Sequence, residues 1–166
     1  MSLRTLILLS PFVLAVILGR AATIPEEFPE QETGPMHHFS MKRYQWNNRP
    51  ILIFAPSRDD RSYCETMIIW NRNIPELDAR DIVLIQVFEE GISRAEGREI
   101  PQDSANHLRE RFQVDDGDMT IVLVGKDGTE KARWDRLPPL QRIYDLIDAM
   151  PMRQREIRSQ ASAHPE

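Results

Sequence analysis

The chain has 166 residues, with 21 basic against 26 acidic residues and a formal net charge of −5. This length suits one domain with a sizeable core, and the acidic balance excludes general nucleic-acid binding, which needs a basic footprint. The sequence contains a single cysteine, so no internal disulfide can form and the apolar core must supply the stability.

Residues 1–21 have the features of a secretory signal peptide. Arg4 makes the start positive, Leu6–Leu18 is almost wholly apolar, and small residues precede a cut after Ala21. An uncleaved anchor is the alternative, but the apolar run is short for a membrane span and contains Pro11. Cleavage removes two arginines and no acid, so the net charge changes from −5 to −7. We therefore expect an exported protein, periplasmic or extracellular, with no membrane span after cleavage.

Residues 22–40 are rich in proline and glutamate and have no hydrophobic period, which predicts a flexible acidic leader. The His37–His38 pair could contact a metal ion. Two adjacent histidines without Cys, Asp or Glu at ligand spacing are a weak metal signal, however. The sequence thus predicts neither a metal nor another cofactor.

Four strands are predicted within a domain spanning residues 41–158. Three continuous apolar runs are typical of strands covered on both faces: Ile51–Phe54, Ile82–Phe88 and Thr120–Val124. The run Thr129–Trp134 instead alternates, which suits a sheet edge, and the "GKDG" before it predicts a tight hairpin turn.

Three helices are predicted between and after these strands, at residues 60–71, 103–112 and 140–150. Asp59 or Asp60 is expected to cap the first helix, while Pro56 should end the first strand and Pro151 the last helix. The order β-α-β-α-β-β-α predicts a thioredoxin-like α/β fold with two parallel crossovers and a closing hairpin. It would form a mixed four-stranded sheet flanked by helices, with residues 51–54 and 120–124 central. Residues 159–166 are expected to be a disordered tail.

Three segments then become recognisable: "RPILIFAPSRDD", "TIVLVGKDGTEKARW" and "PLQRIYDLIDAMPMRQREIR". Together they resemble the domain-of-unknown-function family 4174, a module similar to one in vertebrate sushi-repeat-containing proteins and in the coiled-coil-domain-containing protein 80 group. The resemblance covers about Lys42 to Arg158. It implies a thioredoxin-like fold, export and no established enzyme activity. The chain lacks sushi repeats and long basic segments, so we expect an envelope protein without the matrix roles of the vertebrate relatives.

The strand–loop–helix corner at Ile51–Trp70 is where thioredoxin-like proteins carry reactive cysteines. Dithiol exchange needs two cysteines, and this chain has only Cys64. A peroxiredoxin-like loop would place Thr or Ser where Asp60 stands and the cysteine one position earlier. Cys64 shares a helical arc with Met67 and Ile68, which favours a buried core cysteine over a reactive thiol or an intermolecular disulfide partner.

A second candidate is the arginine cluster of Arg153, Arg155 and Arg158 on an otherwise acidic chain. If Pro151 releases these residues from the last helix, all three can stand in solvent and bind an acidic protein or envelope surface. The alternative is a solvated helical tail. We favour an exported, non-redox binding module that is not an enzyme. The alternatives are a one-cysteine peroxidase or thiol reductase using Cys64, and a purely structural envelope protein.

Overall fold

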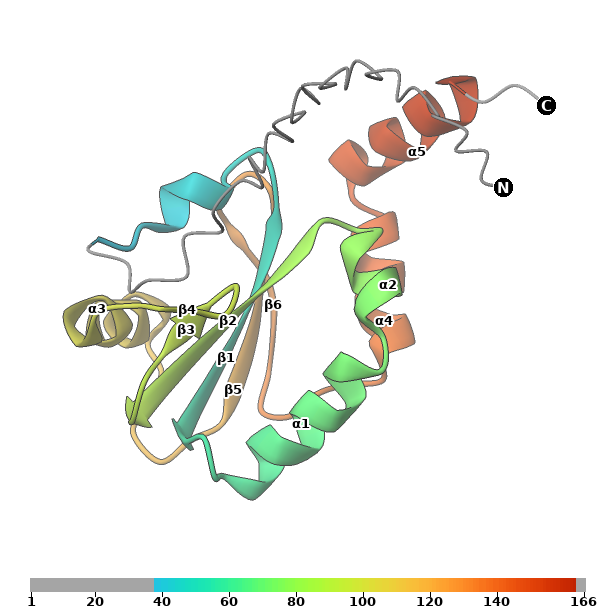
Figure 1. The fold of residues 1–166 in the computed structure, drawn as a ribbon. Helices are drawn as coiled ribbons and strands as arrows, with labels where there is room; N and C mark the ends of the chain where they lie inside the picture. Colours follow the sequence, from blue (N-terminus) through green and yellow to red (C-terminus); the bar gives the residue numbers. More distant parts are fainter. Residues whose placement is uncertain (1–37, 164–166) are drawn as a thin grey trace, which may run out of the picture. The chain divides into compact units, whose positions relative to one another are not determined.

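A computed structural model describes residues 38–163 of the chain (Figure 1). The predicted signal peptide, its cleavage site and the leader before His38 lie outside the described residues, as do residues 164–166. Within residues 38–163 no helix is both long and apolar enough to cross a membrane.

The described part contains six strands, five α-helices and one short 3-10 helix. In chain order they are the 3-10 helix Met41–Tyr44, β1 (Arg49–Ser57), α1 (Arg61–Asn71), α2 (Ile74–Asp78), β2 (Ile82–Glu90), β3 (Arg94–Ala95), β4 (Arg98–Glu99), α3 (Gln102–Phe112), β5 (Thr120–Val124), β6 (Glu130–Trp134), α4 (Leu140–Asp148) and α5 (Pro151–Ala163).

The strands form one mixed sheet in the order β4-β3-β2-β1-β5-β6. β1 runs parallel to β2 and antiparallel to β5, and Leu52 lies opposite both Ile85 and Val122. The two central runs and the edge position of β6 agree with the sequence prediction. The prediction of a second parallel crossover is wrong. β5 starts at the end of the sheet where β2 stops, so it runs antiparallel to β1 and β2. The short β3–β4 hairpin also extends the predicted four strands to six.

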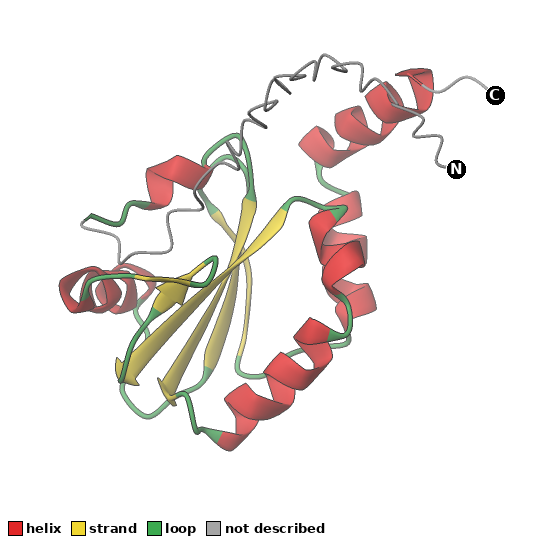
Figure 2. Cartoon of the chain, viewed as in Figure 1, coloured by secondary structure: helices red, strands yellow, loops and turns green. Residues whose placement is uncertain are grey.

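Helices cover both faces of this sheet, with α3 on one side and α1, α2 and α4 on the other (Figure 2). Because side chains alternate along a strand, Leu52 and Phe54 of β1 pack in the core with Leu108 and Phe112 of α3. The alternate residues of β1 point to the opposite face, where they form a second core with residues of α1, α2 and α4. This second core includes Ile51, Ile53, Ala55, Tyr63, Trp70, Leu77, Ile143 and Ile147. Burial on both faces explains why the central strands are continuous apolar runs.

Two prolines were predicted to end a strand and a helix, and the structure shows a different role for each. β1 continues through Pro56 to Ser57, because the flanking residues Ala55 and Ser57 still pair with β2. Pro151 ends α4 but is also the first residue of α5, a position where the missing proline N–H costs no helical hydrogen bond. The tail expected to be disordered from residue 159 is therefore helical through Ala163.

Candidate functional site

The corner between β1 and α1 holds the chain's one sulfhydryl. The Asp60 carboxylate caps α1 by accepting a hydrogen bond of 2.9 Å from the Tyr63 backbone N–H. Cys64 lies in the first turn of this helix and is exposed, and its Sγ donates to the Arg58 carbonyl at 3.5 Å. The prediction of a buried core cysteine is thus wrong. The inward face of α1 carries Tyr63, Thr66 and Trp70. Cys64 lies about 100° around the helix axis from Tyr63 and therefore off this inward face.

The chemistry open to this corner is limited by its composition. With one cysteine in the sequence, no second thiol of the same chain can resolve a mixed disulfide. The position where a peroxiredoxin loop carries Thr or Ser is Asp60, whose carboxylate is engaged as the helix cap. On the inward face of α1, Gln86 donates to the Tyr63 hydroxyl at 2.8 Å, and burial raises the pKa of Tyr63. An exposed thiol remains sterically open to a small oxidant.

The C-terminal arginines are not a single exposed cluster. Only 8% of Arg153 is exposed, and it forms ion pairs with Asp148 at 3.3 Å and Glu156 at 3.4 Å. Arg155 and Arg158 are exposed. The prediction that all three stand in solvent is therefore wrong for Arg153. The cause is that Pro151 starts a new helix, which directs Arg153 toward the end of α4.

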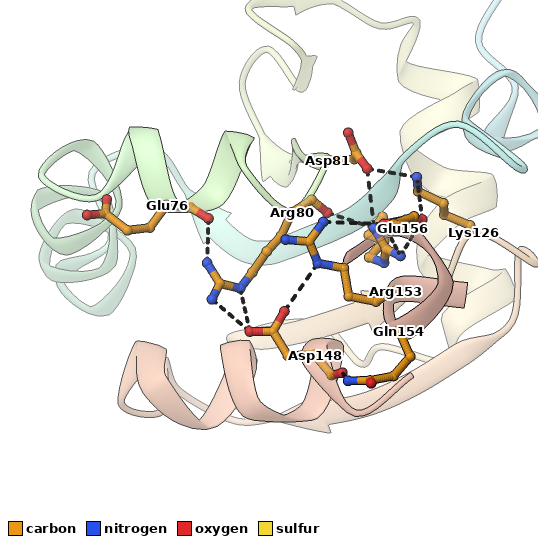
Figure 3. A network of polar contacts seen from close by, with 9 residues as sticks. Glu76, Arg80, Asp81, Lys126, Asp148, Arg153, Gln154 and Glu156 are labelled. Carbon is orange, nitrogen blue, oxygen red and sulfur yellow. Dashed lines mark hydrogen bonds and ion pairs between the residues drawn. The ribbon is translucent and has the colours of Figure 1, made fainter. Parts of the chain in front are cut away.

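Arg153 belongs to a network of charged side chains that sequence reasoning missed (Figure 3). Its most buried member is Arg49, at the start of β1, with 1% of its surface exposed. Arg49 donates to both oxygens of Glu156, at 2.9 and 3.1 Å, and to the Arg80 carbonyl at 2.9 Å. A weaker contact of 3.4 Å reaches Asp81. The network thereby connects the first strand to the last helix.

Lys126 completes the pairing around Glu156. Its Nζ lies 2.7 Å from Asp81 and 2.9 Å from Glu156. Partial burial alone would raise the pKa of Glu156, but hydrogen bonds and attraction from Arg49 and Lys126 outweigh it and lower the pKa to about 2. Nearby, Arg80 pairs with Asp148 at 2.8 Å and its guanidinium lies 4.3 Å from the Tyr144 ring centroid. Local sequence gave no sign of this network, because Arg49 and Glu156 are 107 positions apart.

A groove of about 470 Å³ lies beside this network. It is lined by the turn after β5, the end of α4, the start of α5 and residues Arg49 and Lys131: Arg49, Gly125, Lys126, Asp127, Lys131, Leu146, Ala149, Met150, Pro151 and Met152. The groove lies where β1 begins, whereas Cys64 follows the other end of that strand. Nine residues of strand place these two ends about 26 Å apart.

The hairpin turn shapes one side of the groove. Lys131 packs so closely over Gly125 that a Cβ at position 125 would clash with its side chain. The Lys131 Nζ binds the Asp127 carboxylate at 2.6 Å. Partial burial tends to raise the pKa of Asp127, but hydrogen bonds from Lys131 and Thr129 outweigh that effect and lower it. The predicted "GKDG" turn thus presents Lys126 beside the groove, and β6, the strand after the turn, presents Lys131.

Among residues 38–163, no group of three or more His, Cys, Asp or Glu side chains is arranged to hold a metal ion. His37 lies outside the described residues, and His38 is exposed.

Comparison with solved structures identifies the fold class as thioredoxin-like. The chain is similar to the reduced 2-Cys peroxiredoxin of Plasmodium vivax, with a TM-score of 0.54, 11% identity, and coverage of 69% of this chain and 84% of that one. It is also similar to Plasmodium yoelii Prx1a, with a TM-score of 0.52, 14% identity, and coverage of 70% and 81%. Xanthomonas campestris peroxiredoxin Q gives a TM-score of 0.51 at 11% identity, with coverage of 67% and 82%. Such low identities establish the fold alone.

The family is established by the sequence itself. Residues 40–156 match the model of the family described as Domain of unknown function (DUF4174), and the chain belongs to that family. A relative among characterised sequences is coiled-coil domain-containing protein 80 of Danio rerio, with 27% identity over 139 residues. That match covers 74% of this chain and 16% of the fish protein. The resemblance inferred from the three sequence segments is confirmed.

Proposed function

We propose that this protein is an exported, non-redox binding module built on a thioredoxin-like fold. The observation that carries the proposal is the composition of the β1–α1 corner, where one thiol stands without a second cysteine and Asp60 occupies the helix cap. A redox-active thiolate is favoured by cationic surroundings, and a carboxylate at the helix start opposes its formation.

The partner surface in this proposal is the exposed side of α5. Its start is held by the ion pairs of Arg153 and Glu156, which leaves Arg155, Ile157 and Arg158 exposed on the same helix. Arg155 and Arg158 are three positions apart, so they share one face of α5, and two neighbouring cations suit an acidic protein or an acidic envelope surface because opposite charge accelerates encounter.

Charge reversal tests this surface. The double variant Arg155→Glu/Arg158→Glu should retain wild-type stability, because exposed charges contribute little to it, yet it should capture fewer partners from the envelope fraction. Raising the salt concentration should weaken capture by the wild type in the same way. The matched control is Arg72→Glu/Arg142→Glu, two exposed arginines, one directly after α1 and one in α4. If both double variants capture the same partners in equal yield, α5 is not part of the binding surface.

The second candidate function is a one-cysteine peroxidase or thiol reductase. It is favoured by one observation, the exposure of Cys64 in the first turn of α1. Peroxide consumption and disulfide reduction should be measured for the wild type and Cys64→Ser with a thiol reductant in excess. We expect the same low rate for both proteins. A wild-type rate well above that of Cys64→Ser would replace the non-redox proposal with the enzymatic one.

Export rests on the sequence of residues 1–21. If the signal peptide is removed, N-terminal sequencing of protein recovered from the envelope or the medium should begin at Ala22. Full-length protein confined to the membrane pellet would instead identify residues 1–21 as an anchor.

A further inference from the structure

The groove beside Arg49 combines an apolar wall with a cationic rim. The wall consists of Leu146, Ala149, Met150, Pro151 and Met152, from the end of α4 and the start of α5. The volume of the groove, about 470 Å³, falls within the range of sites for small organic ligands. Two methionines give the wall flexible, polarisable side chains that adapt to aliphatic groups.

The rim carries more hydrogen-bond donors than the protein uses. Each lysine ammonium has three N–H donors, and within residues 38–163 Lys126 binds two carboxylates while Lys131 binds one. The Nε of Arg49 is buried and has no hydrogen-bond partner among the described residues. Pro151 has no N–H, and Gln154 donates to the Met150 carbonyl at 3.0 Å, so the N–H groups of Met152 and Arg153 are the ones without intrahelical partners at the positive end of this 13-residue helix.

From this combination we propose that the groove binds a small amphipathic carboxylate, an aliphatic chain that ends in one carboxylate group. The aliphatic chain would lie against Leu146, Met150 and Met152, and the carboxylate would accept hydrogen bonds from Lys131 and Lys126. Such charge-assisted hydrogen bonds are about twice as strong as neutral ones. A ligand of this kind removes apolar surface from water and at once occupies unused donor positions of the two lysines.

A peptide segment fits the groove less well. Backbone N–H groups of the turn and of the end of α4 are already engaged: Gly125 donates to Thr129 at 2.9 Å, Ala149 to Asp145 at 3.0 Å, and Met150 to Ile147 at 2.9 Å. Along that side of the groove a peptide would therefore find no backbone N–H donors for its carbonyl groups, at a cost in free energy. A cationic ligand is disfavoured because Asp127, the one carboxylate among the described residues that line the groove, is already bound to Lys131.

The proposal is tested with three ligands that share one chain and differ in the head group. Decanoate, decanol and decylamine are titrated into the purified protein by calorimetry. In parallel, methyl NMR signals of Leu146, Met150 and Met152 are followed. Decanoate should bind best and shift these three methyl groups. No saturable binding of decanoate, equal affinity for decanol, or shifts confined to other methyl groups would overturn the proposal.

Three variants test whether decanoate binds in the groove or elsewhere on the surface. Lys131→Met keeps the aliphatic stem and removes the charge, and it should weaken decanoate binding roughly tenfold, the loss of one charge-assisted hydrogen bond. Ala149→Trp should fill the groove and abolish binding. Arg136→Met, at a cation exposed on the loop before α4, should bind as the wild type does. Unchanged affinity in both Lys131→Met and Ala149→Trp would place the ligand elsewhere and overturn the proposal.

This inference does not depend on partner docking at α5. The variant Arg155→Glu/Arg158→Glu removes cations that do not line the groove, so decanoate should bind it within about twofold of the wild type. Loss of decanoate binding in that variant would overturn the assignment to the groove. The same variant and the partner-capture experiment thus give separate answers for the two proposals.

Discussion

Replacing Glu156 by glutamine tests whether α5 is held to the sheet by charge. The substitution preserves shape and removes the carboxylate that binds Arg49 through two hydrogen bonds, at 2.9 and 3.1 Å. Arg49 would keep the Arg80 carbonyl and the longer contact with Asp81. Because the Arg49 guanidinium is buried, water could not take the place of the Glu156 carboxylate, and part of the arginine charge would remain uncompensated.

The expected cost is about 2 kcal/mol at pH 7. Removing one partner from a fully buried pair typically costs about 3–5 kcal/mol, but 22% of the Glu156 side chain is exposed and the glutamine oxygen can still accept one hydrogen bond. A pKa lowered from 4.5 to about 2 corresponds to at most about 3.4 kcal/mol. Solvent screening of the partly exposed carboxylate reduces this value to about 1–2 kcal/mol.

The dependence on pH gives a sharper test than the cost at one pH. Because the pKa of Glu156 is lower in the folded chain, its stabilisation is complete above about pH 4.5 and is lost as the pH falls toward 2. Urea unfolding followed by circular dichroism should therefore separate the wild type from Glu156→Gln at pH 7. The difference should shrink between about pH 4.5 and pH 2, where Glu156 becomes protonated and resembles glutamine.

The control is an ion pair of similar length in solvent. Glu65 lies 2.8 Å from Arg61, with exposed fractions of 61% and 91%, so Glu65→Gln should change stability by less than about 0.5 kcal/mol. Hydrogen exchange of the α5 amides provides a second readout, because α5 could detach without unfolding of the sheet. If Glu156→Gln unfolds at the wild-type urea concentration and its α5 amides exchange no faster, α5 does not depend on the Arg49–Glu156 pair.

Three further predictions concern the core, a helix cap and the thiol. Phe54→Ala removes a fully buried ring 5.9 Å from that of Phe112 and should cost about 3–5 kcal/mol in urea unfolding; a cost below about 1 kcal/mol would contradict this packing. Asp60→Ala removes the acceptor for the Tyr63 N–H and should lower stability by about 1 kcal/mol, whereas Asp60→Asn should retain most of it. Cys64 is exposed, so a disulfide reagent should label folded protein nearly as fast as urea-unfolded protein; strong protection would mean that the thiol is covered.

The sheet was largely predictable because its central strands are buried on both faces. Ile51–Phe54 and Thr120–Val124 are continuous apolar runs for this reason, and the alternation in Thr129–Trp134 matches the edge strand β6. The hairpin of β3 and β4 was missed because each strand has only two residues, too few for a hydrophobic period to emerge.

The candidate site was less predictable because it depends on contacts between distant segments. Neither Arg49 nor Glu156 stands in a sequence motif, and only the packing of α5 against the start of β1 brings them together. For Cys64, helical periodicity was the correct signal but its phase was misjudged. The buried face is set by Tyr63, Thr66 and Trp70, which leaves the next residue along the helix in solvent.

The two outer strands of the sheet have a consequence for self-association. An uncovered edge offers free backbone hydrogen-bonding groups to a second copy of the chain, and short or charged edge strands reduce that risk. At one edge β4 has only two residues. At the other, β6 carries Glu130, Lys131 and Arg133, and Arg133 also donates to the Phe112 carbonyl at 2.6 Å. These charged side chains make β6 a poor template for strand addition, so the protein should resist edge-to-edge polymerisation even when concentrated.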